Sequence, residues 1–124
     1  MNGYCSIKGK VKKGKNRGKN LGFPTANVNL RKKIPEGIYI SKTKIKGKAY
    51  NSLTFIGKAK TYNENLFQAE TFIFDFNKPL YDSWISIFLI KKIRENKKFN
   101  SEKELIKQME EDKKIAGKYF NLKC

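Results

Sequence analysis

Histidine is absent from the 124 residues of this chain. Without an imidazole the chain cannot form a Ser-His-Asp or Cys-His triad, and it cannot bind a metal through histidine ligands. Any general base must therefore be an Asp, a Glu or a Lys in an unusual environment.

Cysteine and long apolar runs are also scarce. The two cysteines, Cys5 and Cys124, lie near opposite ends with no CxxC spacing, which indicates neither a zinc site nor a disulfide framework. The first residues lack an apolar signal core, and no window approaches the roughly 18 apolar residues of a membrane span. We therefore expect a soluble, cytoplasmic protein that does not bind membranes.

Acidic residues are nearly missing from the first half of the chain. Residues 1–60 hold 16 Lys or Arg against the single acid Glu36, and the whole chain has a net charge of +17. Such a surface attracts polyanions, either nucleic acid or nucleotide phosphates. Only three of the 28 basic residues are Arg, although Arg suits base and phosphate recognition better than Lys. A compositional bias toward Lys, serving mainly for solvation, is the alternative.

Short alternating apolar and polar runs dominate residues 4–92 and predict β-strands. Each run is rich in β-branched or aromatic residues and is bounded by Gly, Pro, Asn or Lys. Five or six such strands without intervening helices predict an antiparallel barrel or sandwich, and no linker divides the 1–124 domain. The clearest predicted strands cover residues 4–11, 37–45, 50–56, 67–76 and 84–93.

One helix is predicted at the end of the chain. Ser101 and Glu104 form an S-x-x-E capping box ahead of Leu105, Met109 and Ala116, which share one helical face. We expect this helix to cover residues 101 to about 116 and to end near Gly117.

A glycine-rich basic loop is the first candidate site. Its glycines permit backbone conformations that expose N–H groups, and its cations supply charge, so it is a plausible phosphate cradle. Its spacing differs from a Walker A loop, and a solvated loop between strands is the alternative. The candidate phosphate-binding residues are Gly14, Lys15, Arg17, Gly18, Lys19 and Gly22.

Two further features supply oxygen ligands and a base. In an extended segment, Thr25 and Asn27 project from one face and could ligate a hard cation such as Mg²⁺ together with substrate phosphates, although a local Asx or ST turn is equally compatible. Glu70 lies in a strongly apolar strand and is a candidate general base. Alternatively, Glu70 marks the solvent face of an edge strand.

These segments resemble riboflavin kinase, the module that forms the C-terminal half of bacterial bifunctional FAD synthetases. The Leu-Gly-Phe-Pro-Thr-Ala-Asn string at residues 21–27 is distinctive, and the Glu70 strand and the 93–99 segment follow in the family's order. The resemblance extends from about residue 7 to 116. It implies a mainly β fold, a six-stranded antiparallel Greek-key barrel with a C-terminal helix at about 101–116.

The resemblance also implies an activity and residue roles. The family transfers the ATP γ-phosphate to the riboflavin 5′-hydroxyl to give FMN. By position, Thr25 and Asn27 would bind Mg²⁺ and the nucleotide phosphates, and the 14–22 loop would close over the phosphates. Glu70 would accept the hydroxyl proton, and Arg94 would lie at the flavin side. The histidine motif of the FAD-forming adenylyltransferase is absent, so we expect the product to be FMN and not FAD. We also expect a monomer.

Three residues depart from the family pattern. Phe55 replaces an Asn, Lys60 replaces a Pro, and Phe72 replaces a His. By the resemblance, the first two would alter the shape of the nucleotide loop, and the third would remove a hydrogen bond behind the catalytic strand. A barrel that binds flavin or nucleotide without turnover is therefore the second hypothesis. A basic barrel that binds single-stranded nucleic acid ranks last, because residues 8–19 contain no interleaved aromatics.

Overall fold

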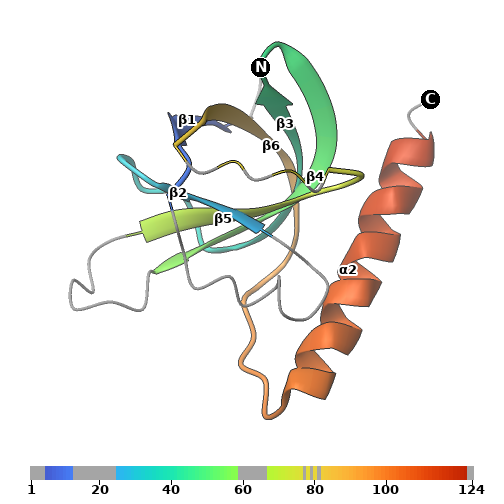
Figure 1. Cartoon of the computed structure of the whole chain (residues 1–124). Coiled ribbons are helices and arrows are strands. Elements are labelled where there is room, and N and C mark those ends of the chain that lie inside the picture. Colours follow the sequence, from blue (N-terminus) through green and yellow to red (C-terminus); the bar gives the residue numbers. More distant parts are fainter. Residues whose placement is uncertain are drawn as a thin grey trace.

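A computed structural model describes residues 5–12, 25–58, 67–76, 78, 80 and 82–122 of the protein. Within these residues, six strands precede the helix α2 (Glu102–Leu122), as Figure 1 shows. The strands are β1 (Cys5–Lys10), β2 (Thr25–Asn29), β3 (Gly37–Ile45), β4 (Lys48–Lys58), β5 (Phe67–Ile73) and β6 (Trp84–Arg94). Among the described residues, no helix is long and apolar enough to cross a membrane.

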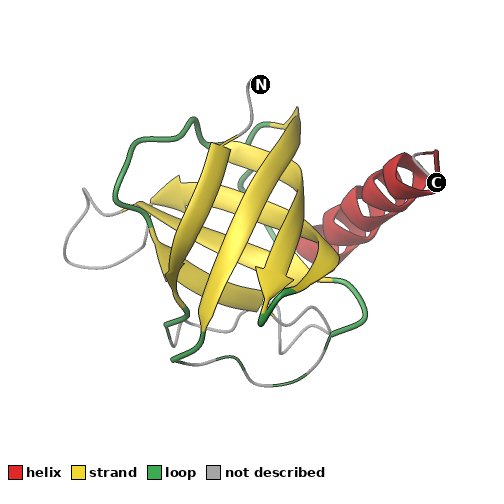
Figure 2. Ribbon diagram, turned by 90° about the horizontal axis from the view of Figure 1, so that it is seen from above, coloured by secondary structure: helices red, strands yellow, loops and turns green. Residues whose placement is uncertain are grey.

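The strands form one antiparallel sheet in the order β1-β6-β3-β4-β5-β2. The sheet curls into a nearly closed barrel (Figure 2), and an isolated bridge joins its two edges, where Lys12 N donates to Asn27 O at 2.7 Å. Strands β3, β4 and β5 follow one another, and β6 returns to lie beside β3, which is a Greek key. The expected six-stranded Greek-key barrel is confirmed.

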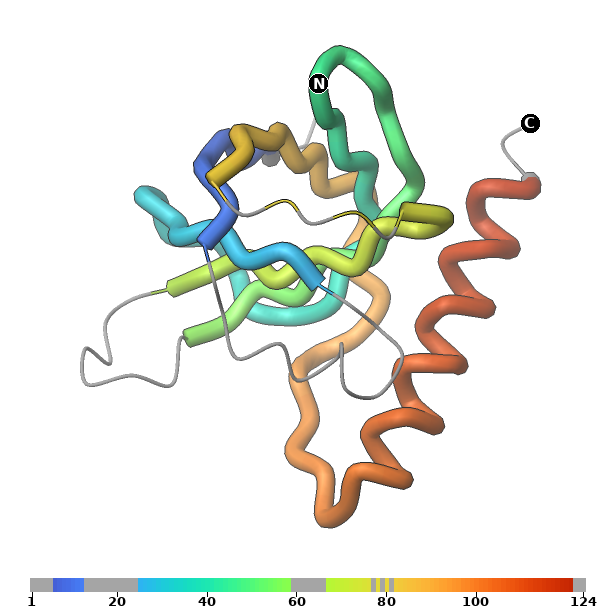
Figure 3. Tube along the Cα trace, viewed as in Figure 1, coloured from blue at the N-terminus to red at the C-terminus, as the bar shows by residue number. Residues whose placement is uncertain are grey.

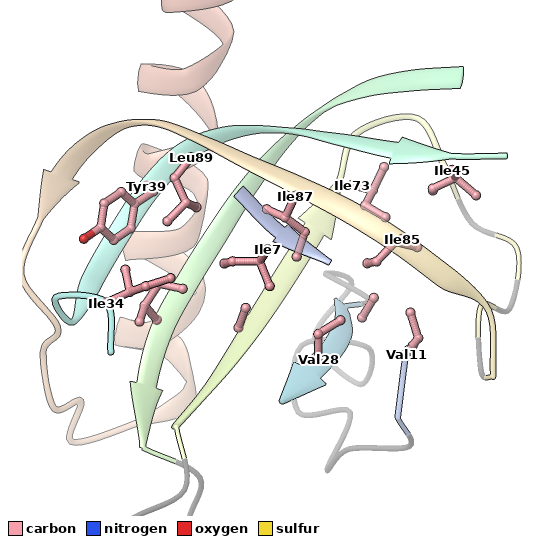
Figure 4. Close-up of a cluster of buried hydrophobic side chains, with 13 residues drawn as sticks. Ile7, Val11, Val28, Ile34, Tyr39, Ile45, Ile73, Ile85, Ile87 and Leu89 are labelled. Atoms are coloured by element: carbon pink, nitrogen blue, oxygen red, sulfur yellow. The ribbon is translucent and has the colours of Figure 1, made fainter. Parts of the chain in front are cut away.

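The barrel interior holds the main apolar core, drawn in Figure 4. Alternate residues of each strand point inward, as Ile85, Ile87 and Leu89 of β6 do, because the side-chain period of a strand is two. A chain of buried hydroxyls crosses the same interior. Each hydroxyl is hydrogen-bonded to another at 2.7 to 3.1 Å, so burying these polar groups costs little free energy. In order along the chain of bonds, the residues are Thr43, Ser52, Ser41, Thr54 and Thr71.

Helix α2 lies along the outside of the barrel (Figure 3). Its Ala116 and Phe120 pack on Ile38, Ile40 and Leu53 of β3 and β4. The expected N-cap is confirmed, because Ser101 Oγ accepts a hydrogen bond from Glu104 N at 3.2 Å. The Glu104 carboxylate reaches back to the N–H of Asn100 rather than to that of Ser101.

The expected end of the helix near Gly117 is wrong. Helix α2 continues to Leu122, because Tyr119 and Phe120 pack against the barrel and this burial outweighs the roughly 1 kcal/mol cost of a helical glycine. The strand expected at 67–76 also ends earlier, at Ile73. Residues 25–29 form a strand of their own, β2.

Gly117 gives the first testable prediction. A Cβ at Gly117 would meet no atom within 4 Å, so Gly117→Ala should raise the free energy of unfolding by about 0.5–1 kcal/mol. At Gly37, where φ is +146°, a Cβ would lie 2.9 Å from the Arg94 carbonyl oxygen, so Gly37→Ala should lower stability by more than about 1 kcal/mol. Urea unfolding of both variants checks this, and equal effects would contradict it.

Candidate active site

Strands β2 and β5 bring three of the expected site residues together. In their antiparallel register Asn27 lies opposite Glu70, and Thr25 lies opposite Phe72, so these side chains share the outer face of the barrel. Thr25 Oγ1 donates a hydrogen bond to Glu70 Oε2 at 2.8 Å. The expected one-face arrangement of Thr25 and Asn27 therefore includes Glu70 as well.

Glu70 is half-buried at the centre of this face. It is paired with Asn27 on one side and with Phe55 of β4 on the other. Phe72 follows two residues later on the same face of β5. The carboxylate is thus bordered by aromatic rings and also accepts a hydroxyl donor, which leaves Oε1 as a second acceptor.

Asn27 carries an unsatisfied donor. The residue is only 4% exposed, and its Nδ2 has no hydrogen-bond partner in the described part of the chain. Leaving a buried donor unpaired costs about 1–3 kcal/mol, so such a group in a well-packed barrel needs an explanation. Its backbone carbonyl, in contrast, closes the barrel by accepting from Lys12.

The oxygen atoms of this face fit a hard divalent cation shared with phosphates. Thr25 donates its hydroxyl hydrogen to Glu70, so the Oγ1 lone pairs are available to a cation, and the Asn27 amide adds a second neutral ligand. No group of three or more His, Cys, Asp or Glu that could hold a metal by itself occurs among the described residues. Mg²⁺ is commonly bound by few protein ligands plus substrate phosphates.

The remaining expected phosphate-binding residues lie outside the described residues. These are Gly14, Lys15, Arg17, Gly18, Lys19 and Gly22. Lys12 is the last described residue before them, and Thr25 is the first after them. Of these two flanking residues, Lys12 pairs with Asn27 and Thr25 bonds Glu70, so both lie beside the candidate site.

A family model described as Flavokinase, riboflavin kinase, matches residues 1–120 of the chain. The chain belongs to the riboflavin kinase family. It is 41% identical over 121 residues to the bifunctional riboflavin kinase/FMN adenylyltransferase of Bacillus subtilis, covering 93% of this chain and 38% of that protein. It is 36% identical over 118 residues to an RNA-binding riboflavin kinase of Bacillus subtilis, covering 94% and 51% of the two chains.

The fold is also that of a solved riboflavin kinase. The crystal structure of the enzyme from Trypanosoma brucei matches 95% of this chain and 80% of that chain with a TM-score of 0.67, at 21% identity. This likeness shows the barrel with its helix. The chain spans about two fifths of the bifunctional Bacillus subtilis relative and about half of the RNA-binding one.

Arg94 of this riboflavin kinase module anchors helix α2 to the barrel. Its Nε and Nη2 donate to the two carboxylate oxygens of Asp112 at 2.9 and 2.7 Å, and Nη1 donates to the Glu95 carbonyl. Asp112 is fully buried, and Gln108 Nε2 also donates to it at 3.0 Å. Arg94 thus holds helix α2 against the barrel, and its expected contact with the flavin stays a prediction.

The role of Asp112 as the partner of Arg94 was missed from the sequence. The residue stands on the apolar stripe of α2, between Met109 and Ala116 at helical spacing. A lone carboxylate on the buried face of a helix needs a cationic partner, because burying an unpaired charge is very costly. The position of Asp112 on the apolar stripe therefore indicates a buried carboxylate with a cationic partner, but it does not identify which Lys or Arg is that partner.

The two described departures from the family pattern have packing roles. Phe72, at the usual histidine position, is buried against Met109 of α2, and Lys113 Nζ lies 5.7 Å from its ring centroid. Phe55 packs on the same side, between Ile38 of β3 and Glu70 of β5. Both substitutions extend the apolar surface under the helix beside the site. Lys60 lies outside the described residues.

Removal of Asp112 tests the helix anchor. Asp112→Ala leaves the guanidinium of Arg94, which is 15% exposed, without its bidentate partner, so the free energy of unfolding should fall by about 3 kcal/mol. Glu111→Ala, which removes the exposed acid next to it, should change stability by less than about 0.5 kcal/mol. Urea unfolding measures both, and a small effect of Asp112→Ala would refute the anchor.

Proposed function

We propose that this chain transfers the γ-phosphate of ATP to the 5′-hydroxyl of riboflavin, giving FMN and ADP. Family membership supports the reaction class. The observation that carries the site assignment is the contact of Thr25 with Glu70 on the face that also holds the unpaired amide of Asn27. The hypothesis of a barrel that binds flavin without turnover has no such support, because Phe55 and Phe72 leave these three residues in place.

Glu70 is the proposed base. Its carboxylate accepts the proton of the ribityl hydroxyl while that oxygen attacks the γ-phosphorus and the bond to the β-phosphate oxygen breaks, releasing ADP. The hydrogen bond from the Thr25 hydroxyl holds Glu70 Oε2 in place, which leaves Glu70 Oε1 for the substrate hydroxyl. A carboxylate base suits a chain that has no histidine.

Thr25 and Asn27 are the proposed ligands of Mg²⁺ and the nucleotide phosphates. A phosphate oxygen would supply the acceptor that Asn27 Nδ2 lacks, and the amide oxygen and the Thr25 hydroxyl would face the cation. Bound Mg²⁺ supplies neutralisation of the phosphate charge during transfer. The basic loop of residues 14–22 is proposed to contribute backbone N–H groups and cations to the same phosphates.

We also propose that these 124 residues make FMN without converting it to FAD. The relative named for both activities is matched over 38% of its length, and the chain has no histidine for the adenylyltransferase motif. Incubation with riboflavin, Mg²⁺ and ATP, followed by chromatographic separation of the flavins, should give FMN alone. A growing FAD peak would contradict this proposal.

Replacement of the proposed base tests the mechanism. Glu70→Gln keeps the shape of the side chain but removes its basicity, so kcat should fall by roughly 100-fold or more. Glu110→Gln, which changes an exposed acid of α2, should leave kcat unchanged. FMN formation and riboflavin fluorescence quenching should be measured together: unaltered turnover in Glu70→Gln would refute the role of Glu70, and binding without turnover in the wild type would favour the inactive barrel.

The buried amide gives a second test with an opposite effect on stability. Asn27→Leu removes an unpaired buried donor while leaving the backbone bond to Lys12 intact, so the free energy of unfolding should stay equal or rise by about 1 kcal/mol. Kinase activity should be lost. An Asn27→Leu variant that is clearly less stable and still active would show that the amide is structural.

A further inference from the structure

The outer face of β6 carries the only strongly exposed aromatic rings in the described part of the chain. Trp84 is 61% exposed and Phe88 is 41% exposed, and Ile115 on α2 is the third exposed large apolar residue there. Between them on β6, Ile85 and Ile87 point into the core (Figure 4), so Trp84, Ser86 and Phe88 point outward. An alternating strand normally places polar residues at such positions, and two exposed rings on one face offer surfaces on which planar groups can stack.

Lysines of the two neighbouring strands flank these rings in register. Lys10 of β1 lies opposite Trp84. Lys8 of β1 and Lys44 of β3 lie on either side of Ser86, in the row between the two aromatics. All three lysines are exposed. We call this surface, made by Lys8, Lys10, Lys44, Trp84, Ser86 and Phe88, the β6 face.

The β6 face has no local negative charge from its own strands. Within the described strands β1, β3 and β6 there is no Asp or Glu. The next outward residue of β3, Lys42, borders the β6 face on the side of α2. Its Nζ lies 5.1 Å from the Phe120 ring centroid. The face therefore combines a positive potential with two separate ring surfaces, about 14 Å apart along the strand at roughly 3.4 Å per residue.

We propose that the β6 face binds single-stranded nucleic acid. Lysines that follow a backbone, with aromatic rings on which bases stack, are the arrangement by which sheets and barrels bind single strands without sequence preference. A second copy of this chain does not suit the face, because lysines would meet lysines and the net charge is +17. The rings are separated by a Lys-Ser-Lys row rather than merged into one apolar patch, which disfavours protein docking.

The β6 face lies on the other side of the barrel from the candidate active site. In the cyclic order β1-β6-β3-β4-β5-β2, strand β6 is diametrically opposite β5, which carries Glu70. Nucleic-acid binding here therefore does not depend on the proposed kinase function. No aromatic residue lies between Lys8 and Lys10 in the sequence, but the sheet places Trp84 and Phe88 of β6 beside this part of β1, about 75 residues later.

Trp84 is the single tryptophan of the chain, so its fluorescence reports directly on the face. Titration with a 12-nucleotide oligouridylate should quench Trp84 emission and raise the anisotropy of a labelled oligomer. With about three lysine–phosphate contacts, the logarithm of the binding constant should fall with the logarithm of salt concentration at a slope of about −2. Unchanged Trp84 emission at saturation would overturn the proposal.

Matched variants distinguish binding at the β6 face from nonspecific attraction by the net positive charge. Phe88→Ala should weaken binding at least about fivefold, and Lys8→Ala with Lys44→Ala should reduce the salt slope by about 1. Lys107→Ala with Lys114→Ala removes the same charge from exposed positions on α2 and should change neither measurement. Unfolding curves of all variants verify that the barrel is intact.

Three further results would refute the assignment. If the Lys8→Ala/Lys44→Ala variant and the Lys107→Ala/Lys114→Ala variant weaken oligonucleotide binding equally, the chain binds by net charge alone. Inorganic polyphosphate that quenches Trp84 as strongly as the oligomer would exclude base stacking. A blue shift of Trp84 emission with anionic phosphatidylserine vesicles, without a response to the oligomer, would assign the face to a membrane surface.

Discussion

Closure of the barrel at Asn27 is the constraint on which the rest of the structure depends. The Asn27 carbonyl accepts a hydrogen bond from the Lys12 N–H, and this bond joins the two edges of the sheet. Strand β2, which carries Asn27, also pairs with β5, so that Asn27 lies opposite Glu70. If β2 shifted by one residue, its outward side chains would turn into the core. The register of β2 at this closure therefore determines which of its side chains fill the apolar interior and which lie on the outer face. A carboxylate, a hydroxyl and an amide are held together by backbone pairing between β2 and β5.

Much of the fold was predictable because its strands alternate strongly. Strand β3 was expected at 37–45 and observed there, and the N-cap at Ser101 follows from local hydrogen bonding alone. The helix end was not predictable, because Gly117 signals a stop locally while Phe120 finds a distant apolar surface on β3 and β4. Tertiary packing overrode the local preference there.

The candidate site was predictable only in part. Thr25, Asn27 and Glu70 could be selected from residue type and spacing, and their closeness follows from the β2–β5 register, which joins residues some 45 positions apart. The pairing of Arg94 with Asp112 could not be found in this way. Many cations were possible partners, and only the path of α2 across the barrel brings this one to a fully buried carboxylate.

The two outer surfaces of the barrel show how one sheet serves different purposes. Under α2, the outward residues of β3, β4 and β5 are apolar, among them Ile40, Leu53 and Phe72, because the helix covers them. On β1, β6 and β3 away from the helix, the outward lysines alone are not informative, since any exposed strand face is polar in a Lys-rich chain. Trp84 and Phe88 are informative, because compositional bias toward Lys does not produce exposed aromatic rings. Their position between lysines of two other strands is a property of the register, and a binding surface accounts for both observations together.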